Sequence, residues 1–171
     1  MPRYSFRVFS ALAIISLFAG CSSYQLGTGS KLTFKTLHVA PVKMVALVPQ
    51  AEPIIGTQLR TAFIHDGRLT LKNSTAAADA TLSVAVHDYY REVGTVRPGD
   101  TGLARKFIIT MTAEATLTDN RNGKDFFTAR KLTVKRDVYT DSGQQQAEYQ
   151  ILPLLAEDLA AKVSHAVLDT W

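Results

Sequence analysis

Residues 80–90, ATLSVAVHDYY, decide the fold, because apolar side chains alternate along them with polar or small ones. Side chains two residues apart on a β-strand share a face, so Leu82, Val84 and Val86 line one face of the predicted strand. We expect this strand to have one buried face and to end near Tyr90, where a polar segment begins.

The same alternation returns twice further along the chain. It predicts a second long strand over residues 107–117 and a third over residues 126–139. The polar segment 91–102 would be a loop, and the turn at 118–124 contains the Asn-Gly pair typical of β-hairpins. Three strands with one apolar face each predict an antiparallel sheet that is covered on one side.

Two segments with helical periodicity can provide this cover. The first is predicted over about 52–66 and would end at Gly67. The second is predicted to begin near residue 150, with Pro153 in its first turn. The apolar residues that recur at helical spacing are Ile55, Leu59, Ala62 and Phe63 in the first helix, and Leu152, Leu155, Leu159, Val163, Ala166 and Val167 in the second.

Two shorter strands are expected on either side of the first helix. One starts at Thr36 and either lies at an edge or ends at Pro41, and the other covers residues 68–72. We therefore predict an α+β fold, a two-layer sandwich in which two α-helices pack on one face of a four- to five-stranded, mostly antiparallel sheet.

The N-terminus is typical of an exported protein. Residues 1–7 carry two arginines and no acid, residues 8–18 are almost all apolar, and small residues precede Cys21. This order describes a secretory signal peptide, and the apolar run is shorter than the roughly 20 residues that span a bilayer. The ending Phe-Ala-Gly-Cys resembles the bacterial lipobox, which implies a diacylglycerol on the Cys21 sulfur and an acylated amino group. The alternatives are a simple secreted protein and a free or buried thiol.

We therefore predict a signal peptide over residues 1–20, a lipidated Cys and flexible tether over residues 21–35, and one α+β domain over residues 36–171. Ser22 stands where an Asp would resemble the inner-membrane retention signal of enteric bacteria. We expect a protein that Cys21 anchors to the outer membrane, on its periplasmic face.

The charge balance and the motifs argue against nucleic-acid binding, metal binding and catalysis. The chain has 19 basic and 15 acidic residues, and two of the arginines lie in the predicted signal peptide, so little net charge is left to bind nucleic acid. The histidines lack metal-ligand spacing, and the adjacent His87 and Asp88 should point to opposite faces of their strand. No nucleophile elbow or phosphate loop is present. We expect no enzyme activity, no metal and no cofactor apart from the covalent lipid on Cys21.

Basic residues gather on the third long strand and around the 91–102 loop. One interpretation is a solvated strand face with an edge that Lys and Arg protect from aggregation. The other is a cluster that contacts anionic groups, since Arg and Lys both bind phosphate well. The candidate contact residues are Arg97, Arg91, Lys106, Arg105, Arg130, Lys131 and Lys135.

A series of short motifs follows in order along the chain. They are Cys21 with Tyr24 and Leu26, Ala78-Asp79 before the first long strand, the Arg-x-Gly of residues 97–99, Gly123-Lys124, Glu148 before the last helix, and Leu159-Ala160. In this order and spacing they resemble the LptE family of lipopolysaccharide-assembly lipoproteins.

The resemblance implies an outer-membrane lipoprotein that works without catalysis. Members of this family insert into the lumen of the LptD β-barrel, plug it, assist its assembly and help to deliver lipopolysaccharide to the outer leaflet. The family's loop arginine falls on Arg97, and we expect Arg91 and Lys106 to help it contact anionic groups of the barrel or the lipid. A second basic position of the family falls on residues 144–146, which are glutamines here.

Two other functions stay open at this point. A lipoprotein subunit of a lipid-transport ABC system can share the anchor and a similar size. An anchored hydrolase would need a nucleophile and a base placed together, which the sequence does not indicate.

Overall fold

The computed structural model describes residues 32–96, 104–139 and 144–169. In chain order the elements are β1 (Thr36–Val39), β2 (Lys43–Met44), α2 (Ala51–Asp66), β3 (Thr70–Lys72), the 3₁₀ helix η1 (Thr75–Ala77), β4 (Ala80–Val96), β5 (Ala104–Asp119), β6 (Asp125–Tyr139) and α3 (Gln144–Leu168). Neither α-helix of the described ranges is at once long and apolar enough to cross a membrane.

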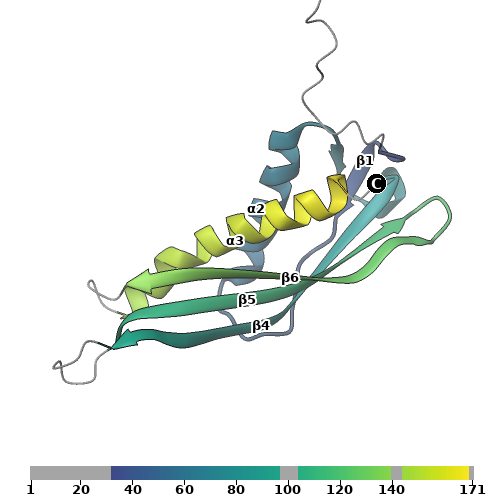
Figure 1. Ribbon diagram of the computed structural model, residues 1–171. Helices are drawn as coiled ribbons and strands as arrows, with labels where there is room; N and C mark the ends of the chain where they lie inside the picture. The colour runs from purple at the N-terminus through teal and green to yellow at the C-terminus, as the bar shows by residue number, and fades with distance from the viewer. Residues whose placement is uncertain (1–31, 97–103, 140–143, 170–171) are drawn as a thin grey trace, which may run out of the picture.

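The strands form one mixed sheet in the order β3-β1-β4-β5-β6, and β2 also pairs with β4. The long strands β4, β5 and β6 are antiparallel (Figure 1), whereas β1 is parallel to β3 and β4, and β2 is parallel to β4. The predicted α+β class with a mostly antiparallel sheet is confirmed. The two-residue strand β2, too short to show a sequence pattern, makes the sheet six-stranded.

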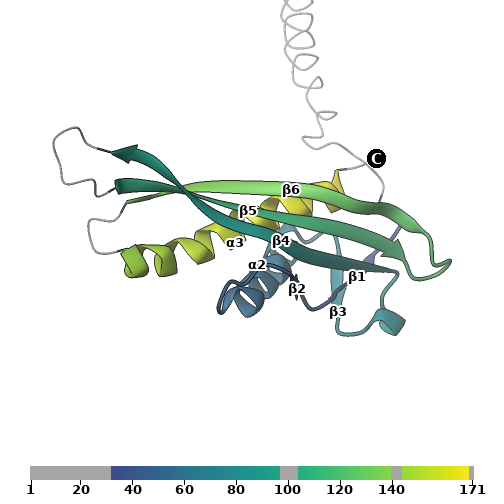
Figure 2. The same ribbon diagram turned by 90° about the horizontal axis from the view of Figure 1, so that it is seen from below.

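Both helices lie on the same side of the sheet (Figures 1 and 2). α3 runs along β6 and also contacts β5, while α2 packs against α3 and against the β1–β3 end of the sheet. We call this side the helix face. The other side, which no helix of the described residues covers, is the open face.

The core fills the space between the helix face and the helices. Alternate residues of β4 and β5 are buried there, as the sequence pattern predicted, because the sheet has one dry side. The largest fully buried side chains are Phe34, Phe63, Leu37, Ile55, Leu59, Leu82, Ile109, Met111, Leu117, Leu155, Leu159 and Leu168. Phe34 is only 2% exposed, so packing begins inside the segment that we predicted as a tether.

The first helix and both glycine-dependent turns agree with the sequence predictions. α2 ends at Gly67, whose φ of 74° is in the left-handed region and whose N–H donates to the Phe63 carbonyl at 3.2 Å. Gly123 has a φ of 69° in the β5–β6 turn. Glycine adopts this conformation without the clash that a Cβ would cause.

Two predicted boundaries are wrong. β4 continues past Tyr90 to Val96, because this stretch pairs with the first half of β5. α3 begins at Gln144, so Pro153 lies inside the helix and Glu148 does not precede it. Pro153 has no N–H to donate to the Tyr149 carbonyl four residues earlier. Tyr149 is exposed, so water can satisfy that carbonyl.

A β-bulge at His87 interrupts the alternation of β4. The register skips His87, and the next residue, Asp88, is opposite Thr112. Thr112 shares the open face with Glu114, and His87 Nε2 lies 3.3 Å from Glu114 Oε2. His87 and Asp88 are therefore on the same face, and the expectation that they point to opposite faces is wrong.

A polar cluster fastens the start of the domain to the sheet. Asp79 Oδ2 accepts hydrogen bonds from the backbone N–H groups of Lys35 (2.9 Å) and Thr36 (3.0 Å), and Thr36 Oγ1 accepts one from the Asp79 N–H (2.8 Å). The Lys35 N–H is the main cause that holds the pKa of Asp79 below its ordinary value, and Thr36 adds to it. The Asn120 side chain also donates to the Ala78 carbonyl at 2.8 Å.

Candidate functional site

The candidate contact residues are spread over the sheet. Cys21 and Arg97 lie outside the described residues, and so does the side chain of Arg105, whose backbone belongs to β5. The other five have described side chains. They divide between the helix face and the open face, and between the two ends of the long strands.

Lys106 is on the open face of the arm, a name we give to residues 88–96 of β4 with the paired parts of β5 and β6. Its Nζ lies 2.8 Å from Asp137 Oδ2 and 6.0 Å from the ring centroid of Tyr139. The hydrogen bond to Asp137 raises the pKa of Lys106 above its ordinary value. Lys106 is therefore a fixed cation beside an aromatic ring.

Arg91 is on the other face of the arm. It is opposite Ile109, which is fully buried on the helix face. The Arg91 guanidinium carbon lies 4.8 Å from the ring centroid of Phe107. Arg91 and Lys106 therefore do not form one site, and the arm carries a cation–aromatic pair on each face.

Two arginines of β6 hold α3 in place. The Arg130 guanidinium stacks on Phe127, 4.3 Å from the ring centroid, and donates to the Ala166 carbonyl at 3.1 Å. A cation at this position is stabilising, because the C-terminal end of the helix dipole is negative. Arg136 forms two hydrogen bonds with Asp158 of α3, at 2.5 and 2.6 Å.

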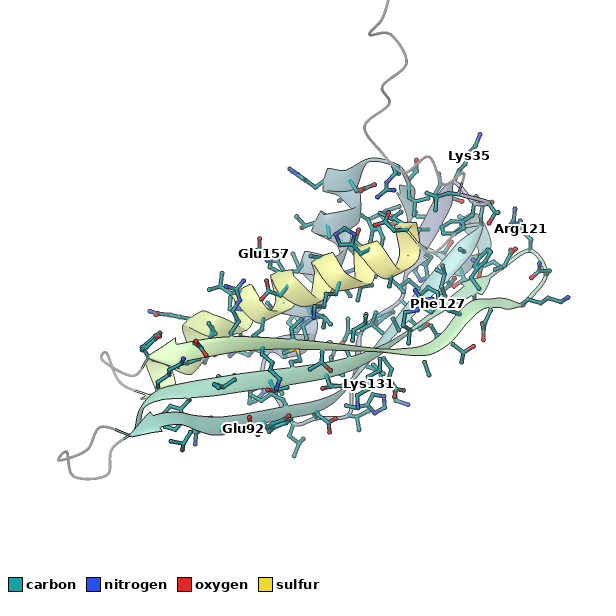
Figure 3. All side chains as sticks on the ribbon, in the orientation of Figure 1. Lys35, Glu92, Arg121, Phe127, Lys131 and Glu157 are labelled. Atoms are coloured by element: carbon teal, nitrogen blue, oxygen red, sulfur yellow. The ribbon has the colours of Figure 1, made fainter. Side chains whose placement is uncertain are left out.

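The two lysines of β6 lie on the open face. Lys131 is opposite Glu114, and Lys135 is opposite Thr110. Figure 3 shows Lys131 and Glu92 on the side of the sheet away from α3. The basic residues of β6 therefore do not form one cluster: the lysines face outward, and the arginines face α3.

The outer edge of β6 is protected. Lys162 of α3 donates from Nζ to the Thr133 carbonyl at 2.6 Å, and charged side chains continue along the strand. This supports the interpretation of β6 as an edge that charge protects from aggregation.

The arm carries exposed apolar side chains, and so does the first part of α3. Tyr90 and Tyr139 are 44% and 59% exposed on the open face, Val93 is 59% exposed on the helix face, and Tyr149 of α3 is 62% exposed. Val93 was not among the candidate residues, because the predicted strand ended near Tyr90. Treating the bulge as a shift in the alternation would have revealed it.

A shallow groove of about 470 Å³ lies between α2 and α3. At one end Arg68 contacts Asp66 at 2.7 Å and Asp169 at 3.2 Å, and His165 Nδ1 lies 2.6 Å from Asp169. The hydrogen bond from Arg68 holds the pKa of Asp66 below its ordinary value, and the one from His165 is the main cause of the lowered pKa of Asp169. Within the described ranges, no three His, Cys, Asp or Glu side chains are grouped so as to hold a metal ion.

Comparison with protein families assigns this chain to a known family. The family model LptE, described as lipopolysaccharide-assembly, matches residues 34–164. The chain belongs to the LptE family. Membership makes it a membrane-associated lipoprotein with a role in lipopolysaccharide assembly. The family consists of assembly factors that work with the lipopolysaccharide transport machinery. No curated protein matches the chain in sequence.

Several solved structures share the LptE-like fold of this chain. Protein XCC0632 from Xanthomonas campestris has a TM-score of 0.59 at 13% identity, over 81% of this chain and 86% of its own. A minor lipoprotein from Acinetobacter baumannii has a TM-score of 0.53 at 19% identity, over 80% of this chain and 94% of its own. PelC from Paraburkholderia phytofirmans, a dodecamer, has a TM-score of 0.50 at 19% identity, over 82% and 95%. At these identities the likeness shows the fold alone.

The LptE-like motifs within the described residues have structural roles. Asp79 fastens the N-terminal segment, Gly123 forms the β5–β6 turn, and Leu159 and Ala160 are buried in α3. These motifs identify the fold. The surface that contacts a partner must therefore be sought among exposed residues, on the open face and the arm.

Proposed function

We propose that this LptE-family protein is anchored to the outer membrane through a lipid on Cys21, plugs the LptD β-barrel, assists its assembly and helps to deliver lipopolysaccharide to the outer leaflet. The observation that carries the proposal is the family match, which spans residues 34–164. The lipobox-like ending before Cys21 supports the anchor.

The chemistry of the open face supports contact with the inside of a barrel. The lumen of an outer-membrane barrel is polar, and the open face is built mainly of hydroxyl and charged side chains. Its residues that solvent reaches include Thr81, Ser83, Asp88, Glu92, Glu114, Thr116, Thr118, Lys131, Thr133 and Lys135. Such a face can pair its polar groups with a polar wall, whereas an apolar face could not.

The arm supports contact with an amphiphilic anion. Lys106 offers a cation beside Tyr139, and Arg91 offers one beside Phe107, so each face of the arm combines positive charge with an apolar surface. Phosphate groups bind such cations, and acyl chains or sugars can pack on the rings. We propose that these residues contact lipopolysaccharide or the barrel together with Arg97 and Arg105. Lys131 and Lys135 are further candidates, while the internal contacts of Arg130 assign it to the packing of α3.

The test is affinity purification of the lipidated protein from membranes, followed by identification of what comes with it. We expect the LptD barrel. Recovery of an inner-membrane ATPase complex without a barrel would support the ABC-system alternative instead. Cys21→Ser should abolish lipid attachment and membrane retention, as measured by mass spectrometry and fractionation.

The arm is tested by lipopolysaccharide binding of the purified protein at low and physiological salt. Arg97→Ala and Lys106→Ala should both weaken binding, and the effect should be smaller at physiological salt because the Debye length there is about 8 Å. Lys72→Ala is the matched control, since Lys72 is an exposed lysine on β3, away from the arm. Unchanged binding in both arm variants would remove these residues from the site.

A further inference from the structure

Gly94 of the arm is a glycine that its own backbone conformation does not require. It is the extra residue of a β-bulge in β4, because the register passes directly from Val93 to Thr95. Its φ lies outside the left-handed region, unlike the φ angles of Gly67 and Gly123, so a residue with a side chain could adopt the same conformation. Glycine weakens the interior of a strand and often marks a place where another group approaches closely.

The group that approaches Gly94 is the side chain of Lys106. A Cβ on Gly94 would lie 3.3 Å from Lys106 Cγ, 3.4 Å from the Lys106 carbonyl oxygen and 3.5 Å from Ile108 Cγ1. Ile108 precedes Ile109, which is buried on the helix face, so Ile108 and the missing Cβ both point to the open face. At 3.3 Å the Lys106 stem would have to move by a few tenths of an ångström. The glycine therefore leaves room for Lys106.

Lys106 is held at both ends of its side chain. Its stem lies beside Gly94, and its Nζ lies 2.8 Å from Asp137 Oδ2 and 6.0 Å from the ring centroid of Tyr139. Only 29% of the side chain is exposed, although it is a lysine on the uncovered face of the sheet. A lysine loses much rotamer entropy when a ligand fixes it, and one that is already held in place loses less.

We propose that Gly94 is a positioning residue, which leaves room for the Lys106 stem so that Nζ is held ready for a phosphate group of lipopolysaccharide. The inference rests on the proposed contact between the arm and lipopolysaccharide. The ion pair with Asp137 leaves this contact possible, because an ammonium group has three N–H donors and Asp137 takes one of them. A Cβ at position 94 would push the stem aside and change the position of Nζ relative to Asp137 and Tyr139.

The test is a double-mutant cycle of lipopolysaccharide binding by the purified lipidated protein, with Gly94→Ala, Lys106→Ala and the double variant. We expect Lys106→Ala to weaken binding roughly fivefold, the upper range for one exposed charge pair, and Gly94→Ala to weaken it roughly threefold. The double variant should bind like Lys106→Ala, because the side chain that Gly94 positions is then absent.

Stability separates a positioning role from a structural one. Alanine removes the entropic cost of glycine in a strand, so the melting temperature of Gly94→Ala should stay within about 3 °C of the wild type. Gly56→Ala is the matched control, since Gly56 of α2 also has a φ outside the left-handed region, and a Cβ there would meet the movable end of the Arg60 side chain at 3.3 Å. Gly56→Ala should bind lipopolysaccharide like the wild type.

Three outcomes would overturn the inference, and they distinguish it from the proposed function. Wild-type binding by Gly94→Ala, with weakened binding by Lys106→Ala, would refute the positioning role and leave the proposed contact of Lys106 intact. An equal loss from Gly94→Ala with and without the Lys106 side chain would show that the glycine acts through the shape of the arm. Wild-type binding by Lys106→Ala would overturn both the inference and the proposed contact.

Dephosphorylated lipopolysaccharide tests the chemistry of the contact. Wild type and Gly94→Ala should bind it equally, because the anionic group that Nζ meets has been removed. A threefold difference that remained with this probe would contradict the assignment of Lys106 to a phosphate group.

Discussion

Removing the Asp79 carboxylate should loosen the N-terminal segment from the sheet. Asp79→Ala deletes two charge-assisted hydrogen bonds, from the backbone N–H groups of Lys35 and Thr36. Losing a hydrogen bond to a charged group costs about 1.5–3 kcal/mol, and one of the two is exposed, so we expect a total loss of about 2–4 kcal/mol at pH 7. For a domain of this size that lowers the melting temperature by roughly 5–15 °C.

The effect of Asp79→Ala should depend on pH in one direction. The pKa of Asp79 is lowered in the folded protein, so the ionised carboxylate stabilises the fold above the ordinary value of 3.8. As the pH falls below that value toward the lowered pKa of the folded state, this stabilisation is lost. The difference between wild type and Asp79→Ala should therefore shrink in acid. Asp79→Asn keeps a neutral acceptor, so it should lose about half as much as the alanine variant at pH 7.

The assay is urea unfolding of the non-lipidated protein, followed by circular dichroism at several pH values. Asp88→Ala is the control, because Asp88 is an exposed aspartate on the open face of β4, the strand that follows Asp79, and it should change stability by less than about 0.5 kcal/mol. The reasoning is refuted if Asp79→Ala unfolds within about 0.5 kcal/mol of the wild type at pH 7 with an unchanged denaturant slope.

Three further stability predictions can be checked by the same unfolding assay. Thr110 Oγ1 is buried and has no hydrogen-bond partner among the described residues, so Thr110→Val should stabilise the fold by about 1 kcal/mol. Thr112→Val is the control and should not stabilise the fold, because it breaks a hydrogen bond to Thr133 at 3.3 Å. Equal gains in stability from the two variants would contradict this prediction. Ala129 has a φ of 47° at a register shift in β6, so Ala129→Gly should stabilise by about 0.5–1 kcal/mol, and a loss of stability would show that the strain is absent. Leu155 of α3 is fully buried, so Leu155→Ala should cost about 2–5 kcal/mol, and a cost below about 1 kcal/mol would argue against the packing of this helix.

The sequence predicted those parts of the fold that depend on local patterns. Alternation in β4, β5 and β6 identified the buried face, because a sheet with one dry side must place every second side chain in the core. Gly67 predicted the end of α2 because its left-handed conformation is local. Pro153 was misleading: a proline suits the first turn of a helix, but here it lies on the exposed side of α3, where water can satisfy the carbonyl that loses its donor.

The parts that could not be predicted depend on register and on contacts between distant residues. One extra residue, His87, shifts the alternation and made β4 look shorter than it is. Arg130 and Arg136 looked like members of a basic surface cluster until α3 brought Ala166 and Asp158 to them. The open face and the exposed aromatic side chains of the arm likewise become visible only when the three strands are aligned.

The central claim is that this protein occupies the lumen of the LptD barrel. The most direct measurement is photocrosslinking in cells from a crosslinking amino acid at position 131, since Lys131 is exposed on the open face and points away from α3. The claim predicts an adduct with LptD whose crosslinked peptide belongs to a lumen-facing strand. An adduct with a different protein, or a normally lipidated and folded protein that gives no adduct with LptD, would contradict it.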